Sequence, residues 1–258
     1  MIHFVGAGPG APDLLTIRGA QQIAQADVII YAGSLVNPEI LKNAKADCKI
    51  YDSASMTLTE VVNIMKQADL SGQTVVRLHT GDPSIYGAIR EQMDELDRDG
   101  IAYDVTPGVS SFCGAAASLH LEYTLPGISQ SVILTRMDGR CKTRPEESVE
   151  ALASHGTTMV YFLSAGELQR LCSRLIDAGR PENTPCALVY KATWEDEKII
   201  RATLATLPDL AAKEGITKTA LVIVGDVVSP EIYERSRLYA PEFSHGCRKA
   251  AAPEDDAK

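Results

Sequence analysis

Short apolar runs alternate with amphipathic or polar stretches through the first half of the chain. The runs at 2–5, 28–31, 74–78 and 103–106 have the length and apolar content of buried strands. Each is followed by a turn rich in small or polar residues and then by a longer, helix-like stretch. Strands and helices that alternate in this way are typical of a mostly parallel sheet covered by helices.

Capping signals indicate where two of the helices begin. Asp13 is expected to cap a helix over 14–25, which would present Leu14, Ile17 and Ile23 on one side. Thr57 and Glu60 have the spacing of a capping box, which predicts a second helix through about residue 68.

The second half of the chain has a different pattern. Its predicted strands lie at 131–135, 158–162, 186–190, 198–203 and 220–224. The acidic residues 195–197 separate two of these strands and indicate a hairpin, so some antiparallel pairing is expected. Apolar residues at helical spacing over 168–176 predict an amphipathic helix in this half.

These patterns predict an α/β protein with two α/β domains, a mostly parallel N-terminal sheet and a mixed C-terminal sheet. The N-terminal domain is expected at 1–123 and the C-terminal domain at 131–235. A turn-forming stretch over 124–130 is the expected linker, and 236–258 is a polar tail.

Composition narrows the class of protein. The chain has 258 residues, 45% of them hydrophobic, and a formal charge of −9, which argues against broad nucleic-acid binding. Its six cysteines form no C-x-x-C pair and show no metal-ligand spacing, so no metal site is expected. The longest uncharged stretch, 105–121, is too polar to span a membrane. With no signal-peptide pattern at the start, a cytoplasmic protein with reduced thiols is expected.

The loop that follows the apolar run at 74–78 is the best candidate for a ligand site. Ligands of open parallel sheets bind beyond the carboxyl ends of the strands, where this loop lies. Pro83 restrains Asp82 to an extended conformation, and Gly81 allows a close approach of the backbone. Such a loop suits a ligand held by main-chain groups and one carboxylate. An ordinary strand-to-helix turn is the alternative.

A glycine-rich turn at 6–11 has the G-x-G-x-x-A pattern of dinucleotide-binding proteins. Pro9 and Pro12, however, lack the N–H groups that a phosphate cradle needs. No acidic residue follows Tyr31, where one would hold a ribose. The turn is therefore interpreted as one wall of a crevice whose ligand is not a pyrophosphate.

Several motifs recur together in the order found in one known family. They are VGAGPG at 5–10, LLT at 14–16, GDP at 81–83, PGVSS at 107–111 and ALVIVG at 220–225. The ordered set, which covers residues 1 to about 228, resembles the tetrapyrrole (corrin and porphyrin) methylases. Residues 31–38 and 81–87 resemble the branch that methylates precorrin-4, or its cobalt complex, at C-11 in cobalamin biosynthesis. The resemblance implies two α/β domains, a homodimer, and S-adenosylmethionine in the cleft between the domains.

The resemblance also implies which residues contact the cofactor. They are Pro9, Thr80, Gly81, Asp82, Ile85, Ser110, Ser111, Leu163, Ala192 and Ala220. Thr80, the Ser110–Ser111 pair and Leu163 depart from the residues found in many relatives but keep their small or apolar character. Uroporphyrinogen methylases carry an aspartate where this chain has Ala32, which counts against uroporphyrinogen as the substrate.

No catalytic residue can be assigned from the sequence. His79, Tyr86 and Glu122 are candidate proton shuttles, and packing in the core or at the rim is the alternative role for each. Methyl transfer to an electron-rich ring carbon needs alignment rather than a covalent intermediate, so the absence of a nucleophile motif is consistent with it.

A basic segment at 136–144 interrupts an otherwise acidic chain. Within it, Arg140 and Lys142 are predicted to bind the carboxylates of a corrin precursor. Ser34 and Tyr86 are predicted to contact the same small-molecule substrate. A solvated loop is the alternative for the basic segment.

Other functions remain open at this point. Uroporphyrinogen III or another precorrin could be the substrate on the same fold. A diphthine synthase or a ribosomal RNA methylase would act on a macromolecule, and the charge of −9 disfavours RNA. A cofactor-binding regulator without activity is the non-enzymatic alternative.

Overall fold

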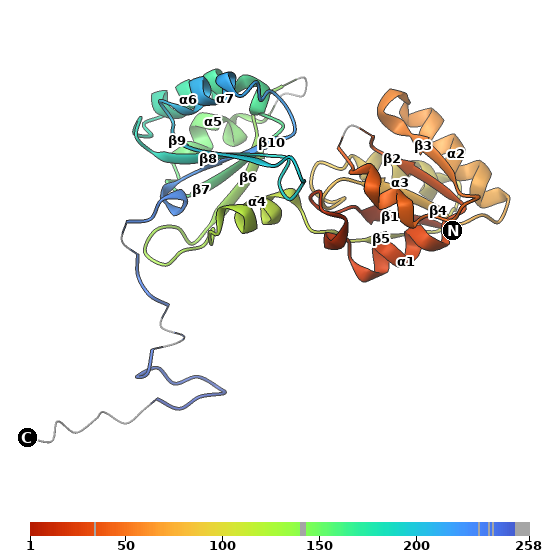
Figure 1. Ribbon diagram of the computed structural model, residues 1–258, viewed down its shortest axis with the longest axis horizontal. Helices are drawn as coiled ribbons and strands as arrows, with labels where there is room; N and C mark the ends of the chain where they lie inside the picture. Colours follow the sequence, from red (N-terminus) through yellow and green to blue (C-terminus); the bar gives the residue numbers. More distant parts are fainter. Residues whose placement is uncertain (34, 140–142, 232, 237, 239, 251–258) are drawn as a thin grey trace, which may run out of the picture.

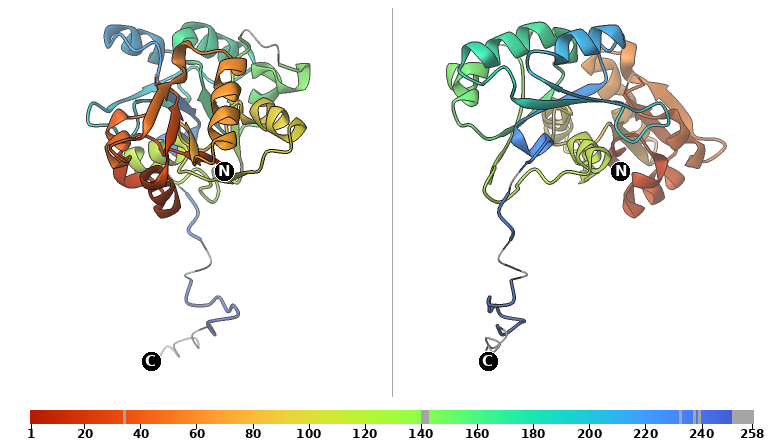
Figure 2. Two further views of the ribbon diagram at one scale, coloured as in Figure 1. Left: turned by 90° about the vertical axis from the view of Figure 1, so that its right-hand side faces the viewer. Right: turned by 60° about the vertical axis from the view of Figure 1, so that its left-hand side comes forward.

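Two α/β units, each a five-stranded sheet covered by helices, make up the body of the protein (Figure 1). The computed structural model describes residues 1–250, apart from 34, 140–142, 232, 237 and 239. Each half contains its own sheet, and the chain leaves the second half as an extended segment (Figure 2). The predicted α/β class, with a parallel first sheet and a mixed second sheet, is confirmed.

The first sheet is entirely parallel. It contains β1 (Ile2–Gly6), β2 (Val28–Tyr31), β3 (Lys49–Asp52), β4 (Val75–His79) and β5 (Tyr103–Thr106) in the order β3-β2-β4-β1-β5. The helices α2 (Leu58–Leu70) and α3 (Ile89–Arg98) cover one face, and α1 (Ile17–Gln25) covers the other. Because alternate strand residues point to opposite faces, Phe4 packs under α2 and α3 while Val5 packs under α1.

Of the two predicted helix caps, one is confirmed and the other is wrong. The Thr57–Glu60 capping box is present and starts α2, as predicted. The prediction for Asp13 is wrong, because Asp13 lies inside a short 3₁₀ turn and Thr16 caps α1 by accepting a bond from the Gly19 N–H. Ile17 is consequently the first residue of α1, and 79% of its surface is exposed rather than buried.

The second sheet is mixed. It contains β6 (Val132–Arg136), β7 (Thr158–Phe162), β8 (Pro185–Tyr190), β9 (Lys198–Thr203) and β10 (Ala220–Val224) in the order β6-β7-β10-β8-β9. Strands β6 and β7 are parallel, whereas β10 runs antiparallel to both β7 and β8. Strands β8 and β9 form the predicted antiparallel hairpin.

Helices cover both faces of the second sheet as well. The helices α5 (Val149–Ala153), α6 (Leu168–Asp177) and α7 (Leu207–Lys213) pack on one face, and α4 (Ser111–Leu119) packs on the other. Ala115 and Leu119 of α4 belong to one core cluster with Val160 and Ile223. Thus α4 lies within the range predicted for the first domain but contributes to the core of the second sheet.

Short 3₁₀ helices complete the secondary structure. They are η1 (Pro12–Leu14), η2 (Pro38–Asn43), η3 (Ser53–Ser55), η4 (Pro145–Glu147), η5 (Ala165–Glu167) and η6 (Asp226–Val228). Among the residues that the structure describes, no helix is both long enough and apolar enough to cross a bilayer.

Candidate functional site

Three glycines bring the carboxyl ends of adjacent strands into direct backbone contact. Gly6 ends β1, Gly81 follows β4 and Gly108 follows β5. A Cβ atom on Gly108 would lie 2.2 Å from the Gly81 carbonyl oxygen, and one on Gly6 would lie 2.6 Å from the Gly108 Cα. No side chain fits between these three strand ends, so they pack against one another through main-chain atoms.

The glycine-rich turn and the loop after β4 are joined by a pair of hydrogen bonds. The Gly81 N–H donates to the Gly8 carbonyl at 2.8 Å, and the Gly8 N–H donates to the Gly81 carbonyl at 3.2 Å. Gly81 has a φ of +60°, a left-handed backbone conformation that residues other than glycine rarely adopt. The turn at 6–11 and the predicted ligand loop therefore form one structural unit.

Asp82 connects this unit to the loop after β5. One carboxylate oxygen accepts a bond from the Gly108 N–H at 2.8 Å, and the other accepts bonds from the N–H (2.8 Å) and the hydroxyl of Ser84. Partial burial raises the pKa of Asp82, but the hydrogen bonds from Ser84 and Gly108 outweigh it, and the net pKa lies below the usual value. Asp82 is thus ionised, and its carboxylate connects the loop after β4 to the loop after β5.

The Ser110–Ser111 pair begins helix α4 beside the same glycines. Ser110 is the N-cap of α4, yet its side chain makes no capping hydrogen bond. A Cβ on Gly81 would lie 3.3 Å from the Ser111 backbone nitrogen. Ser110 is buried, and its hydroxyl and the first N–H groups of α4, which have no partner within the helix, lie beside these glycines.

The second sheet contributes further predicted cofactor residues. Leu163 follows β7 in a left-handed conformation (φ 53°) and is 65% exposed. Ala192 follows β8 and is buried in the same core cluster as Ile85, which comes from the loop after β4. Ala220 begins β10 opposite Tyr190, but its methyl group packs in the core cluster under α6 and α7, so only its main chain belongs to this edge.

Thr80 and Pro9, two of the predicted cofactor residues, each contact a neighbouring segment. The Thr80 hydroxyl donates to the Leu35 carbonyl at 3.3 Å, which connects the loop after β4 to the loop after β2. The Pro9 ring lies close to α4, because a Cβ on Gly114 would be 2.8 Å from the Pro9 Cβ.

Trp194, a residue that the sequence did not single out, joins the two halves. Its indole N–H donates to the Pro9 carbonyl at 3.2 Å, and a Cβ on Gly10 would lie 2.0 Å from its Cδ1 atom. Next to it, the Thr193 hydroxyl accepts a bond from the Ala11 N–H at 3.0 Å. The space beside Gly10 is therefore filled by an indole, which agrees with a turn that is a wall rather than a phosphate cradle. Its signal in the sequence is that it is the single tryptophan of the chain, within the predicted hairpin.

The candidate proton shuttles occupy different environments. His79 is 4% exposed, and burial, with a smaller contribution from the charge on Arg77, lowers its pKa to about 3. Glu122 accepts a bond at 3.5 Å from the Thr124 hydroxyl. Tyr86 is 45% exposed beside Phe162, at a ring-centroid distance of 5.3 Å. Of the three, only Tyr86 combines exposure with contact to both halves, and His79 is a neutral core residue.

Ser34, Arg140 and Lys142 lie outside the described residues. The ends of the basic segment are described: the Asp138 carboxylate accepts a bond from the Thr143 hydroxyl and forms an ion pair of 2.9 Å with Arg174 on α6. Asp138 thus connects the described ends of the segment to each other and to α6.

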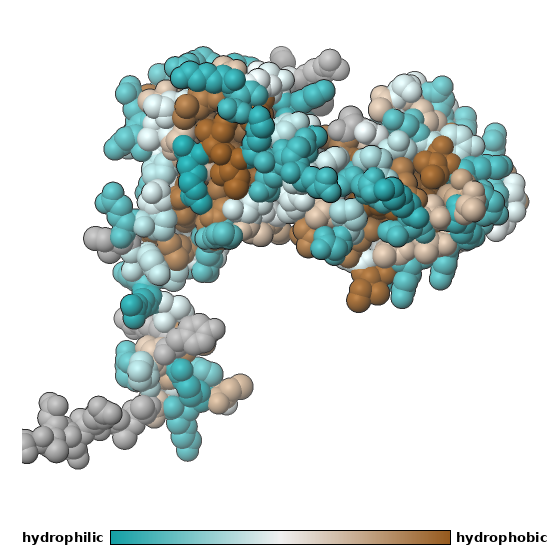
Figure 3. Space-filling view, viewed as in Figure 1, coloured by the Kyte–Doolittle hydropathy of each residue, from teal (hydrophilic) through white to brown (hydrophobic). Residues whose placement is uncertain are grey.

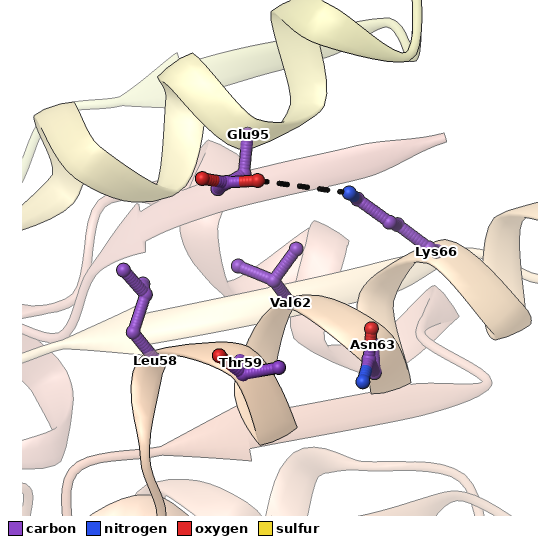
Figure 4. A pocket seen from close by; sticks show the side chains of 6 residues that line it. All are labelled: Leu58, Thr59, Val62, Asn63, Lys66 and Glu95. Carbon is purple, nitrogen blue, oxygen red and sulfur yellow. Dashed lines mark ion pairs between the residues drawn. The ribbon is translucent and has the colours of Figure 1, made fainter.

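Two surface hollows lie away from the cleft loops. One, of about 110 Å³, lies between α2 and α3 and contains the Lys66–Glu95 ion pair (Figure 4). The other, of about 490 Å³, lies along η1 and α1 around Ile17. Within the described part of the chain, no group of three His, Cys, Asp or Glu side chains is placed to hold a metal ion.

Comparison with known proteins assigns the family. The model of the Tetrapyrrole (Corrin/Porphyrin) Methylases matches residues 1–208. The chain belongs to this family. A cobalt-precorrin-4 C(11)-methyltransferase of Methanocaldococcus jannaschii is 51% identical over 249 residues, which cover 96% of each chain.

Solved structures of family members have the same fold. A cobalt precorrin-4 methyltransferase superposes with a TM-score of 0.86 at 42% identity, covering 89% of this chain and 96% of that one. A uroporphyrin-III C-methyltransferase of Thermus thermophilus, solved with S-adenosylhomocysteine, superposes with a TM-score of 0.74 at 25% identity, covering 91% and 96%. The family predicted from the ordered motifs is confirmed.

Proposed function

We propose that the protein is an S-adenosylmethionine-dependent methyltransferase of cobalamin biosynthesis that methylates cobalt-precorrin-4 at C-11. The main support is that the chain is 51% identical to an enzyme named for this reaction. The backbone contact between Gly6, Gly81 and Gly108 agrees with it, because it places the predicted cofactor loops side by side. The identities to uroporphyrin(ogen)-III methyltransferases, 25% and 33%, are lower, which favours a precorrin over uroporphyrinogen.

The residues at this edge fit the cofactor. A polar, zwitterionic ligand needs hydrogen bonds to main-chain groups, and the backbone of the loops after β1, β4 and β5, with the Ser110 hydroxyl that makes no capping bond, would supply them. The residues proposed to hold it are those predicted from the sequence: Pro9, Thr80, Gly81, Asp82, Ile85, Ser110, Ser111, Leu163, Ala192 and Ala220. When bound, S-adenosylmethionine supplies an electrophilic methyl group on a sulfonium.

The protein's own contribution is to align two reactants and exclude water. Asp82 and the Gly8–Gly81 bonds hold three strand ends in one fixed arrangement, which pre-organises the cofactor edge. Tyr86 projects from a left-handed backbone position where the two halves meet, and we place the flat macrocycle against its exposed ring. Ser34, Arg140 and Lys142 remain proposed substrate contacts.

The reaction is tested with the purified protein, cobalt-precorrin-4 and S-adenosylmethionine labelled at the methyl carbon. Mass spectrometry and carbon NMR are expected to locate one label at C-11. A label at another ring carbon, or methylation of uroporphyrinogen III instead, contradicts the proposal. Parallel reactions with metal-free precorrin-4 determine whether cobalt is required.

Cofactor binding is tested by calorimetry with S-adenosylhomocysteine. Saturable binding is expected, with NAD as the matched negative control because the turn at 6–11 is filled by Trp194 rather than open to a pyrophosphate. Binding of NAD without binding of S-adenosylhomocysteine contradicts the assignment of this edge.

We also propose that the enzyme is a cytoplasmic homodimer. A hydrophobic area is visible over the second sheet in Figure 3, and Ile199 on the edge strand β9 is 41% exposed. Exposed apolar surface beside an unpaired strand edge favours association with another chain. Light scattering at micromolar concentration is expected to give the mass of a dimer, and a monomeric mass contradicts this part of the proposal.

A further inference from the structure

Arg136 lies over the ring of Tyr86 where the two halves of the molecule meet. Arg136 is the last residue of β6, and its guanidinium carbon is 5.8 Å from the centroid of the Tyr86 ring. Tyr86 comes from the loop after β4, and its other neighbour is Phe162 at the end of β7. The guanidinium of Arg136 and the rings of Tyr86 and Phe162, which come from the ends of β6 and β7 and from the loop after β4, are therefore brought together.

Both partners are held in place by the backbone around them. Tyr86 has a φ of 55°, an unusual conformation for a bulky residue that the surrounding structure must maintain. The N–H of Met137, the residue after Arg136, donates to the hydroxyl of Ser164 at 3.0 Å, and this hydroxyl donates to the Phe162 carbonyl at 2.7 Å. Ser164 is 1% exposed, so the loops after β6 and β7 are fixed to each other by a buried bond.

The charge on Arg136 differs from that on neighbouring arginines in having no anionic partner. Arg144 pairs with Glu147 at 3.2 Å, Arg170 with Glu167 at 2.6 Å, and Arg174 with Asp138 at 2.9 Å. Within the part of the chain that the structure describes, no carboxylate lies within ion-pair distance of Arg136. A guanidinium against an aromatic face retains free donors that suit a carboxylate.

We propose that Arg136 binds a peripheral acetate or propionate carboxylate of the macrocycle while Tyr86 packs against its ring. The inference rests on the proposed function, because it assigns a substrate contact at the same cleft. A corrin precursor bears several such carboxylates on a flat ring, and the Arg136–Tyr86 pair offers a forked donor beside an aromatic surface. The alternative is that the pair acts only as a clamp between the two halves.

The test compares four single variants of the full-length enzyme. Arg136→Gln removes the charge, Arg136→Lys keeps the charge without the fork, and Tyr86→Phe keeps the ring. Arg170→Gln is the matched control, since Arg170 is an exposed arginine on α6 whose only ion pair is with Glu167 among the described residues. For each, KM and kcat for cobalt-precorrin-4, the Kd of S-adenosylhomocysteine and the Tm are measured at low and high salt.

Arg136→Gln is expected to raise KM for the substrate at least about tenfold, because a charge-assisted hydrogen bond is lost. Arg136→Lys is expected to fall between Arg136→Gln and the unaltered enzyme. The Kd of S-adenosylhomocysteine is expected to stay within about twofold, because Arg136 contacts the substrate side. Added salt is expected to raise KM of the unaltered enzyme more than that of Arg136→Gln, because salt screens this ion pair.

Two results overturn the inference alone. One is an unchanged KM in Arg136→Gln, and the other is a change in Tm and kcat with no change in the salt dependence of KM, which would identify a clamp. If the unaltered enzyme does not methylate cobalt-precorrin-4, the proposed function fails and this inference fails with it. A tenfold higher KM in Arg136→Gln with normal kinetics in Arg170→Gln supports both.

Discussion

The two sheet edges that meet where the halves join differ in the part of the polypeptide that forms the contact: main chain at the first sheet and side chains at the second. At the first sheet, Gly6, Gly81 and Gly108 exclude side chains, and the strand ends meet through main-chain atoms. At the second sheet, side chains such as Leu163 and Trp194 provide the surface. At the first edge, steric contacts therefore limit which residues can be accommodated. At the second edge, the properties of the surface depend on its side chains.

This difference assigns a role to each edge. A cofactor that is the same in every turnover is suited to a rigid main-chain surface, because strand ends packed at backbone distance cannot rearrange. A substrate is suited to side chains, which provide shape and charge without altering the sheet. Substitutions at the first edge should therefore affect folding and cofactor binding together. Those at the second edge, apart from the proposed cofactor contacts Leu163, Ala192 and Ala220, should affect the substrate or the contact between the halves.

The largest effect is expected from Gly108→Ala. The added Cβ would lie 2.2 Å from the Gly81 carbonyl and 2.8 Å from the Gly6 Cα, and both are backbone atoms that can move only with their strands. We expect a loss of about 3 kcal/mol in unfolding free energy and no calorimetric binding of S-adenosylhomocysteine. Gly246→Ala is the matched control, because no atom lies within 4 Å of its added Cβ. Normal binding in Gly108→Ala would show that the first edge is not sterically limited.

Gly10→Ala tests the contact between the two halves. The added methyl group would occupy the position of the Trp194 ring, which must then move towards water. Since Trp194 is the only tryptophan, we expect a red shift of the fluorescence emission and a loss of about 2 kcal/mol in stability. Trp194→Phe, which removes the bond to the Pro9 carbonyl and part of the ring that packs beside Gly10, should cost at least about 1 kcal/mol. Unaltered emission in Gly10→Ala would argue against the contact in solution.

Asp82→Asn is expected to have a smaller, pH-dependent effect. An amide accepts through one oxygen only, so the bond to Gly108 or those to Ser84 are lost, at a cost of about 1–2 kcal/mol at neutral pH. The pKa of Asp82 is lower in the folded protein than its ordinary value of 3.8, so the carboxylate stabilises the fold above that pH. This stabilisation is lost as the pH falls through the lowered pKa, and the difference between the two proteins in chemical denaturation should narrow below pH 3.8. A constant difference at all pH values would contradict the role of the charge.

The smallest effect at neutral pH concerns His79. Burial lowers its pKa from 6.5 to about 3, so the imidazole should not titrate in NMR spectra between pH 8 and pH 5. The unfolded chain binds this proton near pH 6.5 and the folded chain does not, so stability is lost as the pH falls from 6.5 towards 3. His79→Asn identifies the resonance and should remove this part of the pH dependence. A titration near pH 6.5 would restore His79 as a candidate proton shuttle.

Local sequence patterns were sufficient for most of the secondary structure. The strands at 103–106, 158–162, 198–203 and 220–224 occupy the predicted residues. At 158–162 and 220–224 the sequence is nearly or fully apolar over a strand length, which makes the signal clear. The edge strand β3 (Lys49–Asp52) was missed, since its exposed, charged residues give no such pattern. The helices α5 and α7 were also missed, because five and seven residues are too few for a clear period.

The sequence by itself determined the α/β class, the two sheets and the family, since apolar periodicity and ordered glycine motifs are local properties of the chain. Only the tertiary structure decided that α4 packs on the second sheet, that Trp194 fills the space at Gly10, and that Arg136 meets Tyr86. These contacts join residues about 50 to 185 positions apart, as with the Trp194–Pro9 bond. A local pattern shows which residues can form a strand or a helix, but the surface that each side chain meets depends on how distant segments pack.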